Sequence, residues 1–463
     1  MLEGLEIREI KFDSVINNKD FRVDSDFYTK EPKKNKSLKY IKIGDCLTNS
    51  QYGISISMNE NNVGYPIYRM NEIHDMLCDL DVDKHAEIST TEFGKFELKN
   101  RDVLFNRTNS FEWVGRTGIY YQNDNVKRTF ASYLVRFNPD ENIVIAEYLA
   151  TYLSSKYGVW DIKRRARQSI NQTNVNPEEV KEIEIPIINR QIQETIKSNF
   201  ELANSKRIIA NKLYSEAEDI LLKELGLKDW KAVEKSVSVK SFLDFASSGR
   251  LDAEYYQPKY DEIEAKIKAY KGGYDTIENC FRIKDENYTP ENNKDYQYIE
   301  LSNIGGNGEI TGCTSKKGVD LPSRARRIVS TSDIVVSSIE GSLQSCAIVT
   351  NEYNRALCST GFYVLAPQKI NSQTSLLLFK SYPIQQIMKK VCSGTILTAM
   401  NKDEFLNIPI PIIKQEIQRQ IADKIQESFA LKAESKHLLD LAKTAVETAI
   451  EYGEEKAIEL LKS

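Results

Sequence analysis

The chain has little of what metal sites, disulfide frameworks and histidine-based catalysis require. Its seven cysteines are odd in number, scattered and never spaced as C-x-x-C, which argues against a zinc site or a disulfide framework. Only three histidines are present, so few side chains offer histidine acid-base chemistry. We therefore expect reduced thiols, a cytoplasmic location and no bound metal.

Strong charge and long apolar runs are also missing. A net charge of −4 over 463 residues gives no global reason to expect nucleic acid, so any such site must be a local basic patch. No apolar run approaches the roughly 18 residues of a membrane helix, and we expect no membrane partner. The length favours two to four domains.

Motifs for phosphate and cofactor chemistry are absent as well. No GxxxxGK[ST] loop occurs, and the glycine-rich stretch at residues 305–308 has no lysine and is typical of a turn. No glycine-rich adenosylmethionine loop follows a predicted strand, and no [Asp/Asn/Ser]-Pro-Pro-aromatic motif is found. We expect a chain with no catalytic residue and no cofactor.

What the sequence does contain is an internal repeat. Residues 21–28 match residues 249–256 at an offset of 228, and residues 102–105 match residues 333–336. Five such anchors keep one order, with offsets between 225 and 231. Chance does not preserve both order and spacing, so the chain contains two copies of one unit.

Each copy closes with a long amphipathic helix. Isoleucine-proline pairs keep the chain extended before each helix, because proline disfavours α geometry in its predecessor. Gly226 suits the left-handed position that ends the first helix. The residues predicted to pair the helices recur at three, four or seven positions and are Ile192, Ile196, Ala203, Ala210, Leu213, Ala217, Ile417, Ile421, Ser428, Ser435, Leu438 and Ala442.

These helices must bury their apolar stripe against a partner. A helix of about 37 residues is roughly 55 Å long and is unstable alone. The stripe has small residues seven apart, which permit close approach of a second helix. Either each helix packs on its own globule, or the two pair with one another. Because the stripes match in length, we predict an antiparallel pair.

The remaining pattern indicates a mixed α/β (α+β) fold. Short β-branched runs bounded by Asn, Gly and Asp alternate with helical patterns. We predict two similar globular domains joined by two long antiparallel helices, with a pseudo-twofold internal repeat. The predicted parts are a first globular domain (1–188), a central helix (189–226), a linker with the second globular domain (227–413) and a C-terminal helix (414–463).

Basic clusters occur in both copies. Several adjoin amide-rich stretches such as residues 107–110 and 168–174. Arg and Lys neutralise phosphates, while Arg, Asn and Gln pair with base edges. For any single cluster, the alternative is a solvent-exposed protein face that binds no partner. The candidate DNA-binding residues are Arg107, Arg116, Lys127, Arg128, Arg164, Arg165, Arg167, Lys316, Lys317, Arg324, Arg326 and Arg327.

The paired arrangement resembles the specificity (S) subunits of type I restriction-modification systems, over nearly the whole chain. Residues 250–256 (Arg-Leu-Asp-Ala-Glu-Tyr-Tyr) look like the opening of a target recognition domain. Residues 408–413 (Ile-Pro-Ile-Pro-Ile-Ile), leading into residues 415–421, look like the start of the family's spacer helix. Residues 102–107 are similar to a strand-and-loop element of those domains.

The resemblance implies a non-catalytic DNA specificity subunit. Each globular half would be a target recognition domain that reads one half of a split site on double-stranded DNA. The two antiparallel helices would set the distance between the half-sites and dock two methyltransferase (modification) subunits, and restriction subunits would then join. Methyl transfer, ATP hydrolysis and cleavage would belong to these partners.

The two copies differ at places that matter for readout. The position matching Arg107 is Ser338, and the position matching Gly394 is Gln168. Base contacts therefore cannot be transferred from one half to the other, as two different half-sites require. Two alternatives stay open at this point: a protein-only helical scaffold or adaptor without DNA readout, and a degenerate or self-sufficient DNA enzyme.

Overall fold

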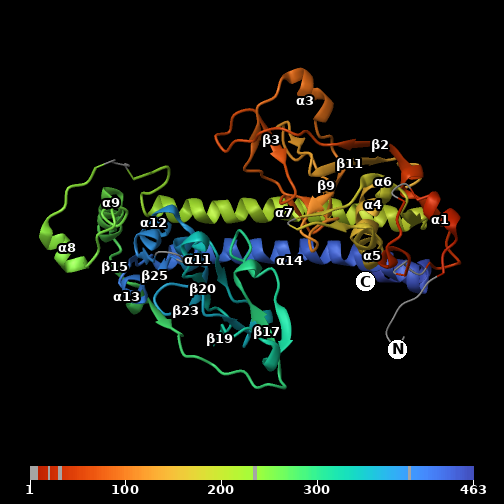
Figure 1. The fold of residues 1–463 in the computed structure, drawn as a ribbon. Coiled ribbons are helices and arrows are strands. Elements are labelled where there is room, and N and C mark those ends of the chain that lie inside the picture. The colour runs from red at the N-terminus through yellow and green to blue at the C-terminus, as the bar shows by residue number, and fades with distance from the viewer. Residues whose placement is uncertain are drawn as a thin grey trace. The chain divides into compact units, whose positions relative to one another are not determined.

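The fold is a mixed α/β arrangement that divides into two compact units, as the sequence predicts. The computed structural model describes residues 9–18, 21–29, 34–170, 172–232, 237–394 and 398–462. Unit 1 comprises Met1–Ile208 and Leu431–Ser463, and unit 2 comprises Ile209–Ala430. Each unit contains one globular half and a part of each long helix, α7 (Arg190–Glu224) and α14 (Gln415–Tyr452) (Figure 1).

The units cut the chain differently from the four parts that the repeat predicts. The predicted parts separate globules from helices at residues 188/189 and 413/414. In the structure, the division between the units falls inside both helices. The reason is packing, because each stretch of helix shares a core with the globule beside it.

The main sheet of unit 1 has six strands in the order β2-β11-β7-β9-β5-β4. All five residues of the central strand β7 are buried, which fits its unbroken Val-Leu-Phe run. Helices α4 (Ala146–Ser154) and α5 (Lys156–Arg165) contribute to the same core. The strands are β2 (Leu47–Tyr52), β11 (Leu134–Pro139), β7 (Asp102–Asn106), β9 (Thr117–Tyr120), β5 (Leu77–Cys78) and β4 (Ile73–His74).

Unit 2 repeats this sheet with four strands in the order β16-β23-β20-β21. The Ile-Val-Val run of β20 is buried like β7, and it likewise lies between two antiparallel neighbours. Helices α11 (Ser372–Lys380) and α12 (Tyr382–Lys390) take the places of α4 and α5. The strands are β16 (Phe281–Ile283), β23 (Phe362–Pro367), β20 (Ile334–Ser337) and β21 (Cys346–Ile348).

The smaller sheets are also duplicated. β3 pairs in parallel with β10, and β17 pairs in parallel with β22. β1 pairs with β14, and β15 pairs with β26, just before each long helix. Their bounds are β3 (Tyr65–Tyr68), β10 (Thr129–Phe130), β6 (His85–Ala86), β1 (Tyr40–Lys42), β14 (Glu184–Pro186), β17 (Asp295–Ile299), β22 (Leu357–Ser359), β18 (Thr314–Lys317), β19 (Ala325–Ile328), β15 (Tyr274–Thr276) and β26 (Pro409–Pro411).

Short helices complete both units. Unit 1 has α1 (Phe12–Ile16), α2 (Ser25–Thr29), α3 (Thr90–Phe96), α6 (Pro177–Lys181) and α15 (Glu454–Lys462). Unit 2 has α8 (Phe242–Ser248), α9 (Pro258–Lys268), α10 (Ile277–Cys280) and α13 (Lys402–Leu406). Among the described residues, no helix has the length and apolar character to cross a membrane.

In unit 1 the two long helices run antiparallel. The Ser435 hydroxyl donates a 2.8 Å hydrogen bond to the Ala203 carbonyl, and the Asn189 N–H donates to Glu454 at 2.6 Å. Residue numbers therefore rise along one helix while they fall along the other. Small residues at this seam let a side chain reach the backbone of the facing helix.

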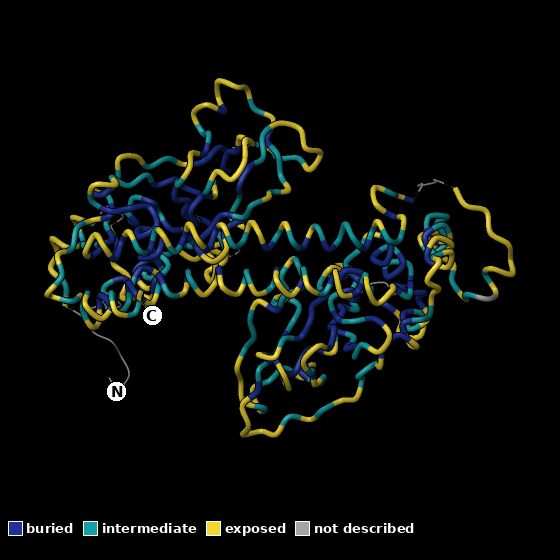
Figure 2. Tube along the Cα trace, turned by 180° about the vertical axis from the view of Figure 1, so that it is seen from behind, coloured by how far each residue is buried: buried dark blue, intermediate teal, exposed yellow. Residues whose placement is uncertain are grey.

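In unit 2 the same arrangement recurs one heptad away. The Ser428 hydroxyl donates to the Ala210 carbonyl at 2.7 Å, and Lys424 forms an ion pair with Glu216 at 2.5 Å. Lys414 and Glu224 lie 3.7 Å apart beyond it. Buried and exposed residues alternate along both helices (Figure 2).

Each helix also packs on its own globule, so the two interpretations of the stripe are not exclusive. Ile192 and Ile196 lie in the core of unit 1 together with strand and helix residues of the globule. Ile421 lies in the core of unit 2, with Ile417 packed against it. Leu213 and Leu438 are only partly buried.

A glycine with a positive φ lies at the C-terminal end of each long helix. Gly226 has φ +64°, which confirms the left-handed residue predicted after the first helix. The predicted C-terminal helix is interrupted, because α14 ends at Tyr452 and Gly453 adopts φ +98° before α15 begins. A residue at that φ cannot continue a right-handed helix.

Ser435 is 5% exposed at the contact between the two long helices in unit 1. We therefore predict that this position accepts only a small side chain. Ser435→Leu should lower the free energy of unfolding by about 1–3 kcal/mol through overpacking. Ser435→Ala should cost about 1 kcal/mol through the lost hydrogen bond. Denaturant midpoints measure both changes, and Ala433→Leu at an exposed position of α14 is the matched control. Equal midpoints for the two leucine variants would contradict the packing described here.

Candidate nucleic-acid interface

A small three-stranded sheet of unit 1 brings together the two amide-rich stretches that the sequence singled out. It has the order β12-β13-β8 and is called the loop sheet of unit 1. Its strands are β12 (Arg167–Gln168), β13 (Thr173–Asn174) and β8 (Thr108–Asn109). Residues about 65 positions apart in sequence thus become neighbours. Asn171, which belongs to the same stretch, lies outside the described residues.

The side chains of this sheet differ in how far they are exposed. Thr108 and Thr173 are buried, while Asn109 and Asn174 are half-buried and Arg167 and Gln168 are exposed. The Thr108 hydroxyl donates to the Asn174 side-chain oxygen at 2.7 Å, which fixes that amide. Residues paired across strands share a face, so Arg167, Asn174 and Thr108 lie on one face of the sheet. Gln168, Thr173 and Asn109 lie on the other. The first face therefore carries a guanidinium and an amide, which are groups that pair with base edges.

Arg107 lies directly before β8 and is braced by an aromatic ring. Its guanidinium carbon is 5.2 Å from the ring centroid of Tyr52, and its NH1 group donates to the Ser132 carbonyl at 3.4 Å. Tyr52 and Tyr133 are exposed beside it. A cation over an aromatic face is attracted by the ring quadrupole and held in orientation.

A second cation-aromatic pair lies further along the same loop. The Arg116 guanidinium is 3.5 Å from the centroid of Trp113, and burial lowers the pKa of Arg116. The Lys163 ammonium donates to the carbonyls of Phe111, Glu112 and Val114. Burial lowers the pKa of Lys163 to about 8. Lys163 thus ties the loop to helix α5.

Unit 2 has a loop sheet with the same backbone frame. It consists of β24 (Cys392–Ser393), β25 (Ala399–Met400) and Ile339, which bridges to Ala399. In unit 1 the Val175 N–H donates to the Arg107 carbonyl at 2.9 Å. At the matching place in unit 2, the Met400 N–H donates to the Ser338 carbonyl at 2.7 Å.

The side chains on these two frames differ in chemistry. Ser338, Ile339, Ser393 and Ala399 occupy the positions of four residues of unit 1. Their counterparts are Arg107, Thr108, Arg167 and Asn174. The face of unit 1 carries a guanidinium and an amide, whereas that of unit 2 carries small hydroxyl and apolar side chains without charge. One backbone frame therefore carries two chemically different sets of side chains.

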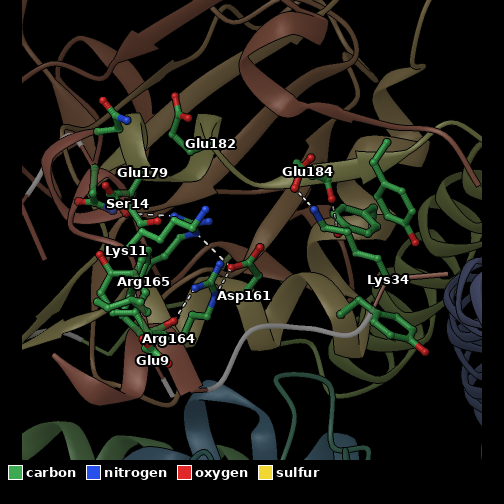
Figure 3. A pocket seen from close by; sticks show the side chains of 18 of the residues that line it. Glu9, Lys11, Ser14, Lys34, Asp161, Arg164, Arg165, Glu179, Glu182 and Glu184 are labelled. Carbon is green, nitrogen blue, oxygen red and sulfur yellow. Dashed lines mark hydrogen bonds and ion pairs between the residues drawn. The ribbon is translucent and has the colours of Figure 1, made fainter. Parts of the chain in front are cut away.

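Two of the predicted DNA-binding arginines of unit 1 lie inside an ion-pair network (Figure 3). Arg164 contacts Asp161 at 2.5 Å and the Phe27 carbonyl at 2.6 Å. Arg165 contacts Asp161 at 3.1 Å and Glu179 at 3.0 Å. Their side chains are only 7% and 6% exposed. Carboxylates compensate both charges, and neither guanidinium presents an appreciable surface.

Of the next two predicted cations, Arg128 is buried in an ion pair and Lys127 is exposed. Arg128 is 8% exposed and holds Asp124 through two hydrogen bonds of 2.6 and 2.8 Å. Lys127 is exposed, and its ammonium is 3.6 Å from a carboxylate oxygen of Glu97. Of the predicted cations of unit 1, Arg167, Lys127, Arg107 and Arg116 are therefore the ones that present surface.

The predicted cations of unit 2 lie on both edges of one sheet, whose strand order is β18-β17-β22-β19. Lys316 and Lys317 are exposed on β18. Arg326 donates to the Ser323 carbonyl, and Arg327 donates to Asn287. Arg324 is exposed, and its carbonyl accepts from the Thr360 N–H next to the loop sheet of unit 2.

Several residues of these surfaces were missed by the sequence reasoning. Tyr52 and Trp113 bring aromatic faces to Arg107 and Arg116, and Tyr133 is exposed beside Arg107. Aromatic residues beside Arg in a turn-rich stretch were the available signal. Within the described residues, no group of three or more His, Cys, Asp or Glu side chains could hold a metal ion.

Comparisons with known proteins bear on the whole chain. A family model described as the type I restriction modification DNA specificity domain matches residues 35–216 and 276–440, about three quarters of the sequence. A putative type I restriction enzyme MjaX specificity subunit of Methanocaldococcus jannaschii is 27% identical over 216 residues, which are 41% of this chain and 50% of that protein. The chain thus spans about half the length of that curated relative.

Other similar proteins match over a shorter stretch or at a lower sequence identity. The type I restriction enzyme EcoKI specificity subunit of Escherichia coli is 28% identical over 118 residues, 25% of each chain. A crystal structure of a type I restriction-modification S subunit from M. genitalium has 14% identity and a TM-score of 0.39, covering 93% of this chain and 98% of that one. An HsdS subunit from Thermoanaerobacter tengcongensis has 12% identity and a TM-score of 0.29, covering 91% and 98%.

The hairpin beside Arg116 predicts a pH dependence of stability. Arg116 NH1 donates to the Ile73 carbonyl at 3.5 Å, and the neighbouring His74 ring lies 3.0 Å from Asp79. The hydrogen bond to Asp79 raises the pKa of His74 above its ordinary 6.5. The stabilisation is therefore complete below pH 6.5 and is lost as pH rises through the raised pKa.

Asp79→Asn should reduce the denaturation midpoint most at acidic pH and least at alkaline pH. Midpoints measured across the neutral range test this. Asp83→Asn removes the same charge from an exposed position and serves as the control. A difference from wild type that does not vary with pH would refute the proposed titration.

Proposed function

Because the chain belongs to the family of type I restriction-modification DNA specificity domains, we propose that it is a specificity subunit that reads a bipartite DNA target. The observation that carries this proposal is the pair of loop sheets. They share their backbone hydrogen bonds but differ in side chains. A protein with two identical half-sites would have no need of two different faces on one frame.

In unit 1 the readout would use a guanidinium and amides. Arg167 offers a bidentate donor pair to guanine, and Asn174, its partner across the sheet, suits adenine. The loop from Arg107 to Arg116 would add phosphate contacts, together with Lys127, which fix the register without reading sequence. Arg128, Arg164 and Arg165 would support the domain through their ion pairs.

In unit 2 the readout would be less polar. Ala399 and Ile339 can contact a thymine methyl group, and Ser393 can donate or accept at several bases. Lys316, Lys317 and Arg324, with Arg326 and Arg327, would neutralise phosphates along the flanking sheet. The two halves would therefore select different base sequences through different chemistry.

The long helices would have two tasks. We propose that they set the spacing between the half-sites and dock two methyltransferase subunits, with restriction subunits joining the assembly. Methyl transfer and cleavage would then take place in the partners. The contact of Ser435 with Ala203 in unit 1 and that of Ser428 with Ala210 in unit 2 support antiparallel pairing of the helices within each unit.

The half-site readout is testable with reconstituted complex on DNA carrying random sequence. Arg167→Ala should reduce discrimination in one half-site by about 1–3 kcal/mol and leave the other half-site unchanged. Ser393→Ala should do the reverse. Lys127→Ala should weaken binding to all sequences alike and make the salt dependence shallower by about one counterion.

Recovery of no split motif by the wild-type complex would refute the proposal. If the complex assembles but Arg167→Glu leaves its DNA binding intact, a protein-only scaffold is favoured. Incorporation of labelled methyl groups by the purified chain would instead indicate a self-sufficient enzyme. Charge reversal at Arg164 or Arg165 is unsuitable here, because it would break the ion pairs with Asp161 and Glu179.

The spacer role predicts a change in site length. Deleting residues 205–211 from α7 and residues 427–433 from α14 removes one heptad from each helix and keeps their register. The pair shortens by about 10 Å, so the spacer between half-sites should lose about 3 base pairs. Methylated-motif sequencing measures the spacer. An unchanged spacer, with both half-sites retained, would contradict the proposed ruler.

A further inference from the structure

The first repeat opens with an arginine that is locked into a compact group. Arg22 donates through Nε and NH2 to both oxygens of Asp24, at 2.7 and 2.9 Å. Its NH1 group donates to the carbonyl of Arg165 at 2.8 Å. The Tyr28 hydroxyl donates to the carbonyl of Arg22 at 2.9 Å, and the guanidinium covers the Phe27 ring at 4.8 Å.

The second repeat builds the same group from equivalent residues. Arg250 donates to both oxygens of Asp252 at 2.7 and 3.0 Å, and its NH2 group also donates to the Cys392 carbonyl at 2.9 Å. The Tyr256 hydroxyl donates to the Arg250 carbonyl at 2.7 Å. The guanidinium lies 4.6 Å from the Tyr255 ring centroid. We call each group a clasp.

The two clasps bind main-chain carbonyls that lie one position apart when the repeats are aligned. The Arg165 carbonyl lies two residues before Arg167, which begins the outer strand of the loop sheet of unit 1. The Cys392 carbonyl lies one residue before Ser393, which occupies the position of Arg167 in unit 2. The clasp of unit 1 therefore fixes the backbone just ahead of β12, and the clasp of unit 2 fixes the first residue of β24. Each of these strands carries an exposed side chain.

A glutamate that follows the loop sheet at the matching position of each repeat forms an ion pair with an arginine. Glu179 follows the loop sheet of unit 1 and pairs with Arg165 at 3.0 Å. Glu404 follows the loop sheet of unit 2 at the matching position, and it lies 3.7 Å from Arg250 itself. The chain before and after each hairpin is thus held by charge in both units.

The backbone before each arginine also matches. Gly249 has φ +66° and precedes Arg250, while Phe21 has φ +49° and precedes Arg22. A phenylalanine is strained in the left-handed region, because its Cβ lies too close to the following carbonyl oxygen. It persists only where the surroundings impose that conformation. In unit 1 the contacts of Arg22, Asp24 and Tyr28 impose it.

We infer that Arg22 and Arg250 are positioning residues for base readout, each setting the place of the outer strand in its own unit. They do not touch DNA themselves, because their side chains are only 8% and 14% exposed and each is bound to a carboxylate and a main-chain carbonyl. Arginine is required since its planar fork binds a carboxylate and a carbonyl at once. The inference rests on the proposed function of the loop sheets.

The test compares Arg22→Lys and Arg250→Lys in the full chain, assembled with its methyltransferase partners and selected on random-sequence DNA. Lysine keeps the charge and loses the fork. Arg22→Lys should reduce base discrimination about tenfold, which corresponds to 1.4 kcal/mol, in the half-site that unit 1 reads. Arg250→Lys should do so only in the other half-site. Each variant is the control for the other.

A merely structural role would give a different result. Equal weakening of both half-sites in a complex that assembles normally would overturn the inference. If Arg22→Lys does not fold, Tyr28→Phe removes a single hydroxyl from the same clasp and should still relax only the first half-site. Unchanged discrimination in Tyr28→Phe, with faster amide exchange at residues 166–168, would also overturn it.

The wild-type complex separates this inference from the proposed function. If wild type selects no split motif, the proposed function fails. If wild type selects a split motif and both lysine variants select it equally well, only the positioning role of the clasps fails.

Discussion

The constraint on which the candidate interface depends is main-chain hydrogen bonding within the loop sheets. The bonds from Val175 to Arg107 and from Met400 to Ser338 join backbone groups only. They hold the strands in place whatever side chains the strands carry, because every residue but proline has the same donor and acceptor. Arg107 can therefore be replaced by serine in the second copy while the frame persists.

Much of the fold could be predicted because its signals are local or repeated. The repeat anchors at residues 102–105 and 333–336 became equivalent central strands. Gly226 ended its helix as expected, and the family resemblance is confirmed by the match to residues 35–216 and 276–440. These features depend on spacing, glycine geometry and hydrophobic pattern, all of which a sequence displays directly.

The site was harder to predict because it depends on long-range partners. The sequence does not show that Arg128 faces Asp124 or that Arg165 faces both Asp161 and Glu179. A run of cations is the same pattern whether it faces solvent or carboxylates. The pairing of Thr108 with Asn174 is likewise invisible, since a ladder between distant two-residue strands leaves no periodicity.

The separation of frame from side chains has a consequence for how such a protein can change over generations. Exposed positions such as Arg167 and Ser393 can be substituted at a cost in stability usually within about 0.5 kcal/mol. Drift at these positions is therefore close to neutral for folding. Under the proposed function, a lineage can acquire a new base preference in one half while the other half keeps its old one, without passing through an unfolded intermediate.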